Sequence, residues 1–195
     1  MDRISNTEKL RTDEVHKKET AVGYQFAAIG LGPILLAQGF YVRFVTPKLP
    51  EPTGARCGVE GAGKPLRLLI LGDSAAVGVG SDSQSSALSG QLVTALSIHY
   101  YLSWKLMAKT GHKVSDVLHH MESADQECFD VAVVSVGVND VTGGTSLKKW
   151  QNTLGHLCDL LRFKFEIQHV LFSSLPPMHA FPALPIPLRW YAGKR

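Results

Sequence analysis

Short aliphatic runs alternate with segments of helical periodicity over most of the chain. The runs at 68–71 and 131–136 are almost wholly apolar, which predicts strands buried on both faces, as in a parallel sheet. Two further strands are predicted at 104–108 and 170–175. Apolar residues at helical spacing predict helices at 87–98, 115–121 and 147–165. This alternation predicts an α/β fold, a three-layer α/β/α sandwich with a mostly parallel sheet and right-handed crossovers.

Each of the two most apolar strands ends in a glycine followed by polar residues. Gly72-Asp73-Ser74 follows the first strand, and Gly137-Val138-Asn139-Asp140 follows the second. Open parallel sheets bind ligands at the carboxyl ends of their strands, so Ser74 and Asn139 are predicted at one rim. A serine hydroxyl can act as a nucleophile, and an uncharged amide can hydrogen-bond a developing oxyanion. The pattern favours acyl transfer. A structural alternative is that Ser74 only caps the following helix.

These motifs resemble those of the SGNH hydrolases, also called GDSL hydrolases. Gly72-Asp73-Ser74 matches the first block of that family, with Ala75 where the name-giving leucine often stands. Gly137-Val138-Asn139-Asp140 matches its third block, Gly-x-Asn-Asp, and Gly111 stands where the second-block glycine is expected. The chain is most similar to the bacterial lipase- or lysophospholipase-like esterase branch, from about residue 66 to its end. The resemblance implies a flavodoxin-like SGNH hydrolase fold.

The resemblance also implies a role for each motif residue. Ser74 would be the nucleophile, and the oxyanion hole would combine the Ser74 and Gly111 backbone N–H groups with the Asn139 side chain. Asp73 and Asp140 would be structural. The substrate would be a small-molecule or lipid ester, and neither a metal nor an organic cofactor is implied.

One block of the family pattern is missing from this sequence. Asp-x-x-His, which supplies the general base and its orienting carboxylate, does not occur after Asn139, and the last acidic residue is Glu166. We therefore expect a carboxy-terminally truncated domain without its final strand, with impaired activity. His179 and His112 are weak substitutes for the base, since neither follows an acidic residue three positions earlier. The alternatives are a non-catalytic ligand-binding remnant and a flavodoxin-like binding module.

The first third of the chain differs in composition from the rest. Residues 1–20 are polar and charge-mixed, which predicts disorder, and 46–65 is a predicted Pro/Gly linker before the hydrolase domain at 66–195. Residues 21–45 begin with 22 positions that carry no charge, which is long enough to span a bilayer. A membrane anchor or interfacial helix is predicted there, with a bacterial inner-membrane or periplasmic location. A soluble helix laid over the domain and a cleaved signal peptide are the alternatives.

Charge and cysteine content exclude several other classes. The net charge is +3, with no arginine-rich run, so nucleic-acid binding is not expected. Cys57, Cys128 and Cys158 lack metal-ligand spacing and are predicted to be free, buried thiols. Residues 58–64 match part of a phosphate loop, but Pro65 replaces the required Ser or Thr and the segment precedes a strand, so nucleotide binding is not expected.

Overall fold

The fold was analysed in a computed structural model, which describes residues 30–47, 49–180 and 184–193. The chain divides into two compact units. The larger comprises residues 47–178, and the smaller combines the described residues before 47 with those after 178. The disorder predicted for 1–20 and the first part of the apolar segment at 21–45 lie outside the described residues.

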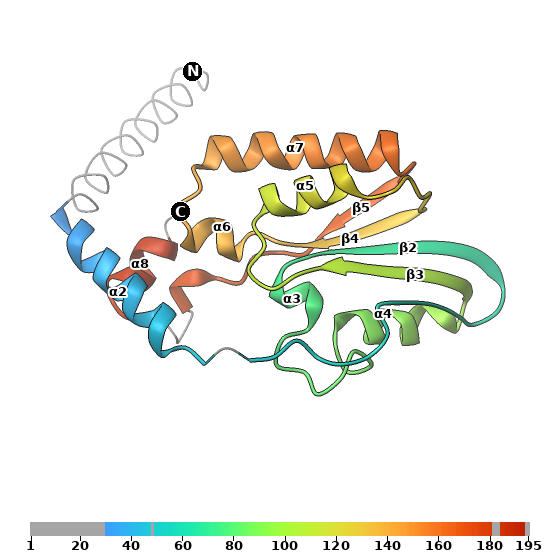
Figure 1. Ribbon diagram of the computed structural model, residues 1–195, viewed down its shortest axis with the longest axis horizontal. Helices are drawn as coiled ribbons and strands as arrows, with labels where there is room; N and C mark the ends of the chain where they lie inside the picture. The colour runs from blue at the N-terminus through green and yellow to red at the C-terminus, as the bar shows by residue number, and fades with distance from the viewer. Residues whose placement is uncertain (1–29, 48, 181–183, 194–195) are drawn as a thin grey trace, which may run out of the picture. The chain divides into compact units, whose positions relative to one another are not determined.

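The larger unit is built on one five-stranded sheet with the order β1-β3-β2-β4-β5 (Figure 1). Its strands are β1 (Cys57–Glu60), β2 (Lys64–Gly72), β3 (Tyr100–Ala108), β4 (Val131–Ser135) and β5 (His169–Phe172). Strands β2 to β5 pair in parallel, whereas β1 pairs antiparallel with β3. In this register Gly72 lies opposite both Ala108 and Ser135, so three strands end side by side.

Helices cover both faces of the sheet, as the alternation of elements predicts. They are α3 (Ser74–Val77), α4 (Leu88–Ser97), α5 (Val114–Ser123), α6 (Val138–Thr142) and α7 (Leu147–Lys164). In Figure 1, α5 and α7 lie on one side of the sheet and α3 and α4 on the other. The predicted three-layer α/β/α class is confirmed, and the two central strands carry the motif residues at their carboxyl ends.

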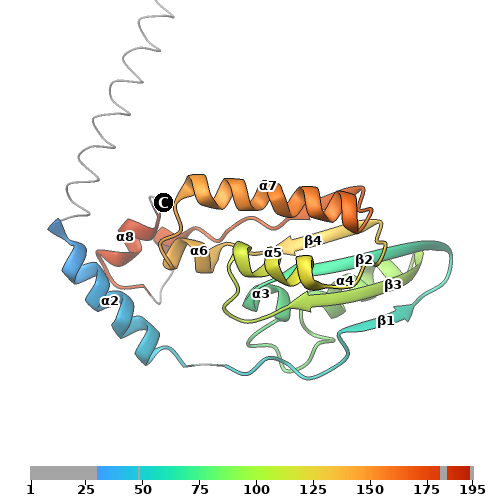
Figure 2. The same ribbon diagram turned by 45° about the horizontal axis from the view of Figure 1, so that its top comes forward.

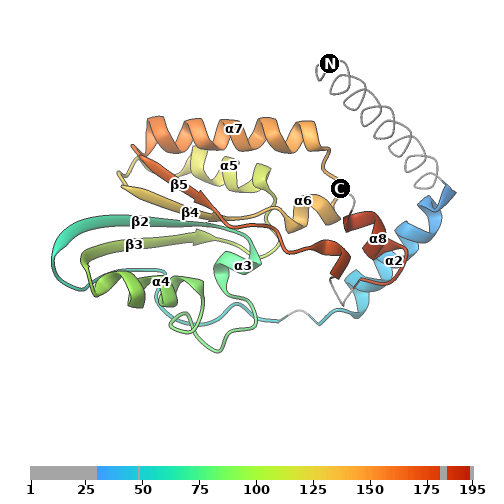
Figure 3. The ribbon, with the colours of Figure 1, turned by 180° about the vertical axis from the view of Figure 1, so that it is seen from behind.

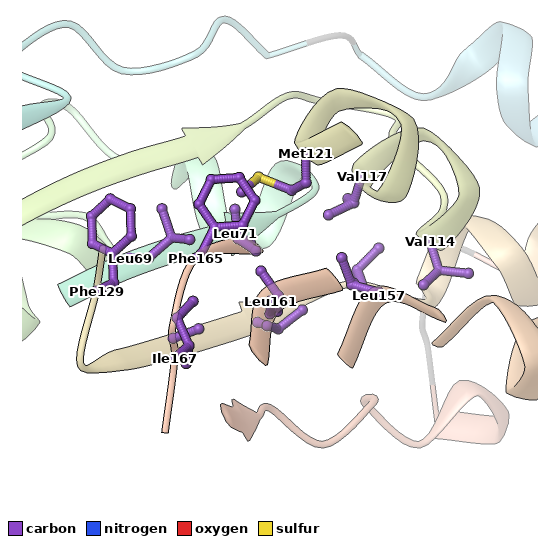
Figure 4. Close-up of a cluster of buried hydrophobic side chains, with 13 residues drawn as sticks. Leu69, Leu71, Val114, Val117, Met121, Phe129, Leu157, Leu161, Phe165 and Ile167 are labelled. Carbon is purple, nitrogen blue, oxygen red and sulfur yellow. The ribbon is translucent and has the colours of Figure 1, made fainter. Parts of the chain in front are cut away.

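Strand β2 is buried on both faces because successive side chains alternate between two cores. Leu69 and Leu71 belong to the cluster with α5 and α7, and Leu68 and Ile70 to the cluster with α3 and α4. Figure 4 shows the first cluster, in which β2 residues pack with others such as Met121 and Leu161. Each fully buried aliphatic side chain contributes about 1.5–3 kcal/mol of stability. The four aliphatic residues therefore hold β2 at the centre of the fold.

Strands β2 and β3 begin earlier than predicted, and β1 lies in the segment predicted as a linker. Strand β2 begins at Lys64. Strand β3 begins at Tyr100, four residues before the predicted start. The prediction missed its amino-terminal half because side chains there alternate between buried and exposed and form no apolar run. The edge strand β1 has no apolar signature, since its residues are exposed or half-buried. Gly58 of β1 lies over the buried Trp104, where a Cβ would come within 3.1 Å of the indole nitrogen.

The opposite edge of the sheet is formed by β5 (Figure 3). This strand ends at Phe172, three residues before the predicted end. Within the described residues it pairs only with β4, and its Leu171 and Phe172 side chains are 58% and 44% exposed. Apolar side chains are therefore accessible along this unpaired edge.

The smaller unit contains α2 (Gly32–Val45) and α8 (Leu188–Gly193), with η1 (Met178–Ala180) at its border. The Gln38 side chain joins the two helices, because it donates to the Ile186 carbonyl at 2.7 Å and accepts from the Leu188 N–H at 3.0 Å. No helix in the described part of the chain is long and apolar enough to cross a membrane. The segment predicted as an anchor includes residues 21–29, which lie outside the described residues, so the anchor stays a prediction.

Candidate active site

The first motif forms a sharp turn between β2 and α3. Gly72 has φ +148°, and a Cβ there would collide with the Ser135 carbonyl oxygen of β4, so only glycine fits. The Asp73 N–H donates to that same carbonyl at 3.0 Å. Asp73 is the N-cap of α3, with Oδ1 accepting from the Ala75 N–H at 3.0 Å. The alternative that Ser74 merely caps the helix is therefore wrong.

The Asn139 side chain joins all three motifs at the carboxyl edge of the sheet. Its Nδ2 donates to the His112 carbonyl at 2.9 Å, next to Gly111, and to Asp73 Oδ2 at 3.4 Å, next to Ser74. The predicted position of Ser74 and Asn139 at one rim follows from these contacts. Asp140 is buried behind them and accepts from the Val114 N–H at 2.9 Å, which fixes the start of α5.

Gly111 lies in the loop that follows β3. The loop starts against β2, because the Lys109 N–H donates to the Gly72 carbonyl at 3.2 Å. Gly111 has φ +87°, and the space where its Cβ would lie has no other atom within 4 Å. Within the described parts of the chain, neither the Gly111 N–H nor the Ser74 N–H has a hydrogen-bond acceptor. Two backbone donors are thus left available at this edge.

The Ser74 side chain is half-buried at the start of α3. None of the described residues forms a hydrogen bond with its hydroxyl. The small neighbour Ala75 is exposed, so no bulky side chain at that position covers the hydroxyl. Among the described residues, the Ser74 hydroxyl and the Ser74 and Gly111 N–H groups thus have no hydrogen-bond partner, and the two residues follow the neighbouring strands β2 and β3.

Two buried carboxyl groups support this edge. Burial raises the pKa of Asp73, and the charge of Asp140 raises it further, while backbone N–H groups of Ala75 and Gly137 oppose the shift. Both side chains are 2% exposed, and Asp140 Oδ1 has no partner within the described residues. Neither carboxyl group forms an ion pair with a described residue, and perturbed buried carboxyl groups are often found at functional sites.

The two substitute-base candidates have different surroundings. His112 is half-buried, and its pKa is lowered chiefly by burial and also by nearby His120, while Asp116 opposes the shift. Its ring centroid lies 6.3 Å from that of His120, in a hollow of about 700 Å³ between the end of β3 and α5. His179 is exposed on η1. A base role for either histidine stays a prediction.

The described residues offer no metal centre. Among them, no group of three or more His, Cys, Asp or Glu is arranged to hold an ion. The three cysteines are free, as predicted, but not buried: Cys57 is exposed, whereas Cys128 and Cys158 are half-buried.

Sequence reasoning missed one contact at this site. Glu51 accepts two hydrogen bonds from Thr110, the residue that precedes Gly111. Glu51 lies in the Pro-rich segment before β1, where no local pattern distinguishes a carboxylate with a tertiary partner from a solvated one. Only the tertiary structure brings this carboxylate to the loop.

Comparisons with known proteins found solved structures of similar fold and a matching family. The fold is similar to that of AlinE4, an SGNH-hydrolase family esterase, with 21% identity and a TM-score of 0.51 over 64% of this chain and 67% of that one. A member of the lipolytic protein G-D-S-L family from Veillonella parvula DSM 2008 also matches, with 14% identity and a TM-score of 0.49 over 68% of this chain and 70% of that one.

A third match is an acetylxylan esterase from Geobacillus stearothermophilus, with 16% identity and a TM-score of 0.49 over 68% of this chain and 69% of that one. A search of curated proteins yields no match. The model of the GDSL-like lipase/acylhydrolase family matches residues 70–195, which is well over half of the chain. The chain therefore belongs to the GDSL-like lipase/acylhydrolase family and is, by that membership, a hydrolase of ester bonds.

Proposed function

We propose that Ser74 is the nucleophile of an ester hydrolase. Its Oγ attacks the carbonyl carbon, the oxyanion binds the Ser74 and Gly111 N–H groups and Asn139 Nδ2, and the alcohol leaves as an acyl-enzyme forms. Water then attacks the acyl-enzyme and releases the acid, which restores the Ser74 hydroxyl. The observation that supports this most is that the Ser74 hydroxyl and the Ser74 and Gly111 N–H groups, which follow the neighbouring strands β2 and β3, have no partner among the described residues.

The contacts of Asn139 suit the third oxyanion donor. Its 2.9 Å bond to the His112 carbonyl holds the amide in place. Its second bond, to Asp73 Oδ2, is 3.4 Å long and therefore weak. Because that bond is long, the amide N–H can turn from Asp73 to a developing oxyanion at a small cost when the new bond is shorter.

A serine hydroxyl needs a base to become a good nucleophile near neutral pH. None of the described imidazoles hydrogen-bonds to Ser74 Oγ, and no Asp-x-x-His follows Asn139. We therefore propose that this 195-residue chain turns esters over slowly. The same observation favours a second candidate function, the binding of an ester or acyl ligand without turnover.

A fluorophosphonate probe tests the proposed nucleophile in the full chain. We expect labelling of the wild-type protein and none of Ser74→Ala, while Ser115→Ala, at an exposed serine of α5, labels like the wild type. Slow hydrolysis of p-nitrophenyl acetate is expected for the wild type and Ser115→Ala, and none for Ser74→Ala. Labelling that persists in Ser74→Ala contradicts the assignment, and a wild-type chain that never labels supports binding without turnover.

A membrane contact through 21–45 is a further part of the proposal, with a location at the inner membrane or its periplasmic side. Its support is an apolar row on α2, where Leu36, Phe40 and Phe44 lie four residues apart and are 65%, 73% and 91% exposed. We expect the full chain to float with lipid vesicles and Phe40→Ser/Phe44→Ser to stay with the soluble fraction. Equal flotation of the two proteins would contradict a contact through α2.

A further inference from the structure

A segment outside the family match contacts the loop that carries Gly111. Residues 51–56, here called the strap, precede β1, and the family match begins only at residue 70. Glu51 Oε1 accepts from the Thr110 N–H at 3.0 Å and from the Thr110 hydroxyl at 2.7 Å. One carboxylate oxygen thus binds both the backbone and the side chain of Thr110. The peptide plane that bears the Gly111 N–H starts at this residue.

We propose that Glu51 is a positioning residue that holds the Gly111 N–H in its oxyanion-binding orientation by fixing Thr110. The proposal rests on the proposed function, because it assigns a partner to one of the three donors. Glu51 does not touch the substrate in this scheme. It acts through the Thr110 backbone, which would otherwise be a solvent-exposed turn with freedom to rotate.

The charge of Glu51 suits this task. Hydrogen bonds from Thr110, first from its N–H and then from its hydroxyl, lower the pKa of the Glu51 carboxyl. The group is therefore an anion at neutral pH, and hydrogen bonds to an anion are about twice as strong as neutral ones. Arg56 Nη2 donates to the Ala108 carbonyl at 3.1 Å and lies 3.4 Å from Glu51 Oε2. Arg56 thus connects the same carboxylate to the end of β3.

The strap also contacts the loop that follows the Ser74 helix. The Thr53 carbonyl accepts from the Gln84 N–H at 2.9 Å, and Gln84 Nε2 donates to the carbonyl of Val77, the last residue of α3, at 3.0 Å. Figure 2 shows the segment that leads into β1. One short segment is therefore bound to the Gly111 loop and, through Gln84, to the last residue of the helix that begins at Ser74.

Glu51→Ala tests the proposal through the kinetics of the full chain. We expect kcat for p-nitrophenyl acetate to fall about tenfold with little change in KM, less than the loss of about 10²–10³ seen when an oxyanion donor itself is removed. Glu51→Gln should recover most of the loss, because its amide oxygen can accept the same two bonds. Glu60→Ala removes another exposed carboxylate, from β1, and should leave kcat unchanged.

Amide hydrogen exchange provides a readout that does not depend on turnover. The Thr110 N–H should exchange slowly in the wild type and in Glu51→Gln, and faster in Glu51→Ala. Equal Thr110 exchange rates in the wild type and Glu51→Ala would overturn the strap proposal. If both proteins are active, equal kcat values would overturn it as well. A wild-type chain that neither labels with fluorophosphonate nor hydrolyses esters would instead refute the proposed function, and the exchange rates would still decide the Glu51 contact.

Discussion

The carboxyl groups at the two ends of strand β2 differ in their partners. At the amino end, Asp130 accepts three hydrogen bonds from Arg67: from its N–H at 2.7 Å, from Nη2 at 2.7 Å and from Nε at 3.2 Å. These bonds lower the pKa of the Asp130 carboxyl. At the carboxyl end, Asp73 forms no ion pair with any described residue, and burial raises its pKa.

The difference separates groups that stabilise the fold from groups kept available for binding. The Arg67–Asp130 pair is held by three hydrogen bonds and joins β2 to the residue that precedes β4. The carboxyl end leaves two N–H groups and a hydroxyl without described partners. A site has to leave donors open if they are to bind a charge that develops only in the transition state.

The largest expected effect is at the carboxyl end. Asn139→Ala should lower kcat by about 10²–10³ with little change in KM, because one oxyanion donor is lost. Stability should fall by less than about 1.5 kcal/mol, the typical value of one neutral hydrogen bond. Steady-state kinetics and urea unfolding measure the two effects, with Asn152→Ala on the exposed side of α7 as the matched control. If Asn139→Ala raises KM and leaves kcat unchanged, Asn139 binds the substrate in the ground state and not the transition state.

The amino end should show the reverse pattern. Arg67→Met should lower the free energy of unfolding by about 0.5–1 kcal/mol, since the pair is partly exposed and screened by solvent. Fluorophosphonate labelling of Ser74 in the folded variant should not change. Urea unfolding followed by circular dichroism measures the first effect. A large loss of labelling with unchanged stability would show that the two ends are not separate in role.

The smallest expected effect is in the dependence of stability on pH. The folded-state pKa of Asp130 lies below its ordinary value of 3.8, so its stabilisation is complete above that value and is lost as the pH falls through the folded pKa. The stability difference between the wild type and Arg67→Met should therefore shrink below about pH 4.

Asp73 contributes with the opposite sign. Its folded-state pKa lies above 3.8, so its ionisation destabilises the fold, and protonation restores stability as the pH falls from the folded pKa towards the ordinary value. Urea unfolding of Asp73→Asn and the wild type across this range measures the contribution. A pH-independent difference between these two proteins would contradict an ionised, desolvated Asp73.

The parts of this architecture that follow from sequence are those with a local signature. The apolar runs of β2 and β4 and the periodicity of α7 predict the layers, and the residues after the strands predict which side chains meet at the rim. The sequence does not predict the edge strand β1, because its residues are exposed or half-buried and carry no apolar alternation. The helix cap falls on Asp73 and not on Ser74, a choice set by the turn at Gly72.

Contacts between distant segments have no such signature. Glu51 and Thr110 are 59 positions apart, and each is an unremarkable polar residue in its own segment. Their pairing depends on how the chain enters the sheet through β1. The general base of Ser74 stays a prediction, because the sequence pattern that would mark it does not occur after Asn139.

Binding of an alkylboronic acid, followed by amide NMR of the full chain, tests the central claim most directly. A tetrahedral boronate on Ser74 places an oxygen where the oxyanion would form. We predict downfield shifts of the Ser74 and Gly111 amide protons and of one Asn139 side-chain proton, no shift of the Arg67 amide, and no effect in Ser74→Ala. Shifts that persist in Ser74→Ala, or that leave the Ser74 and Gly111 amides unmoved, would contradict an oxyanion site at the carboxyl end of β2.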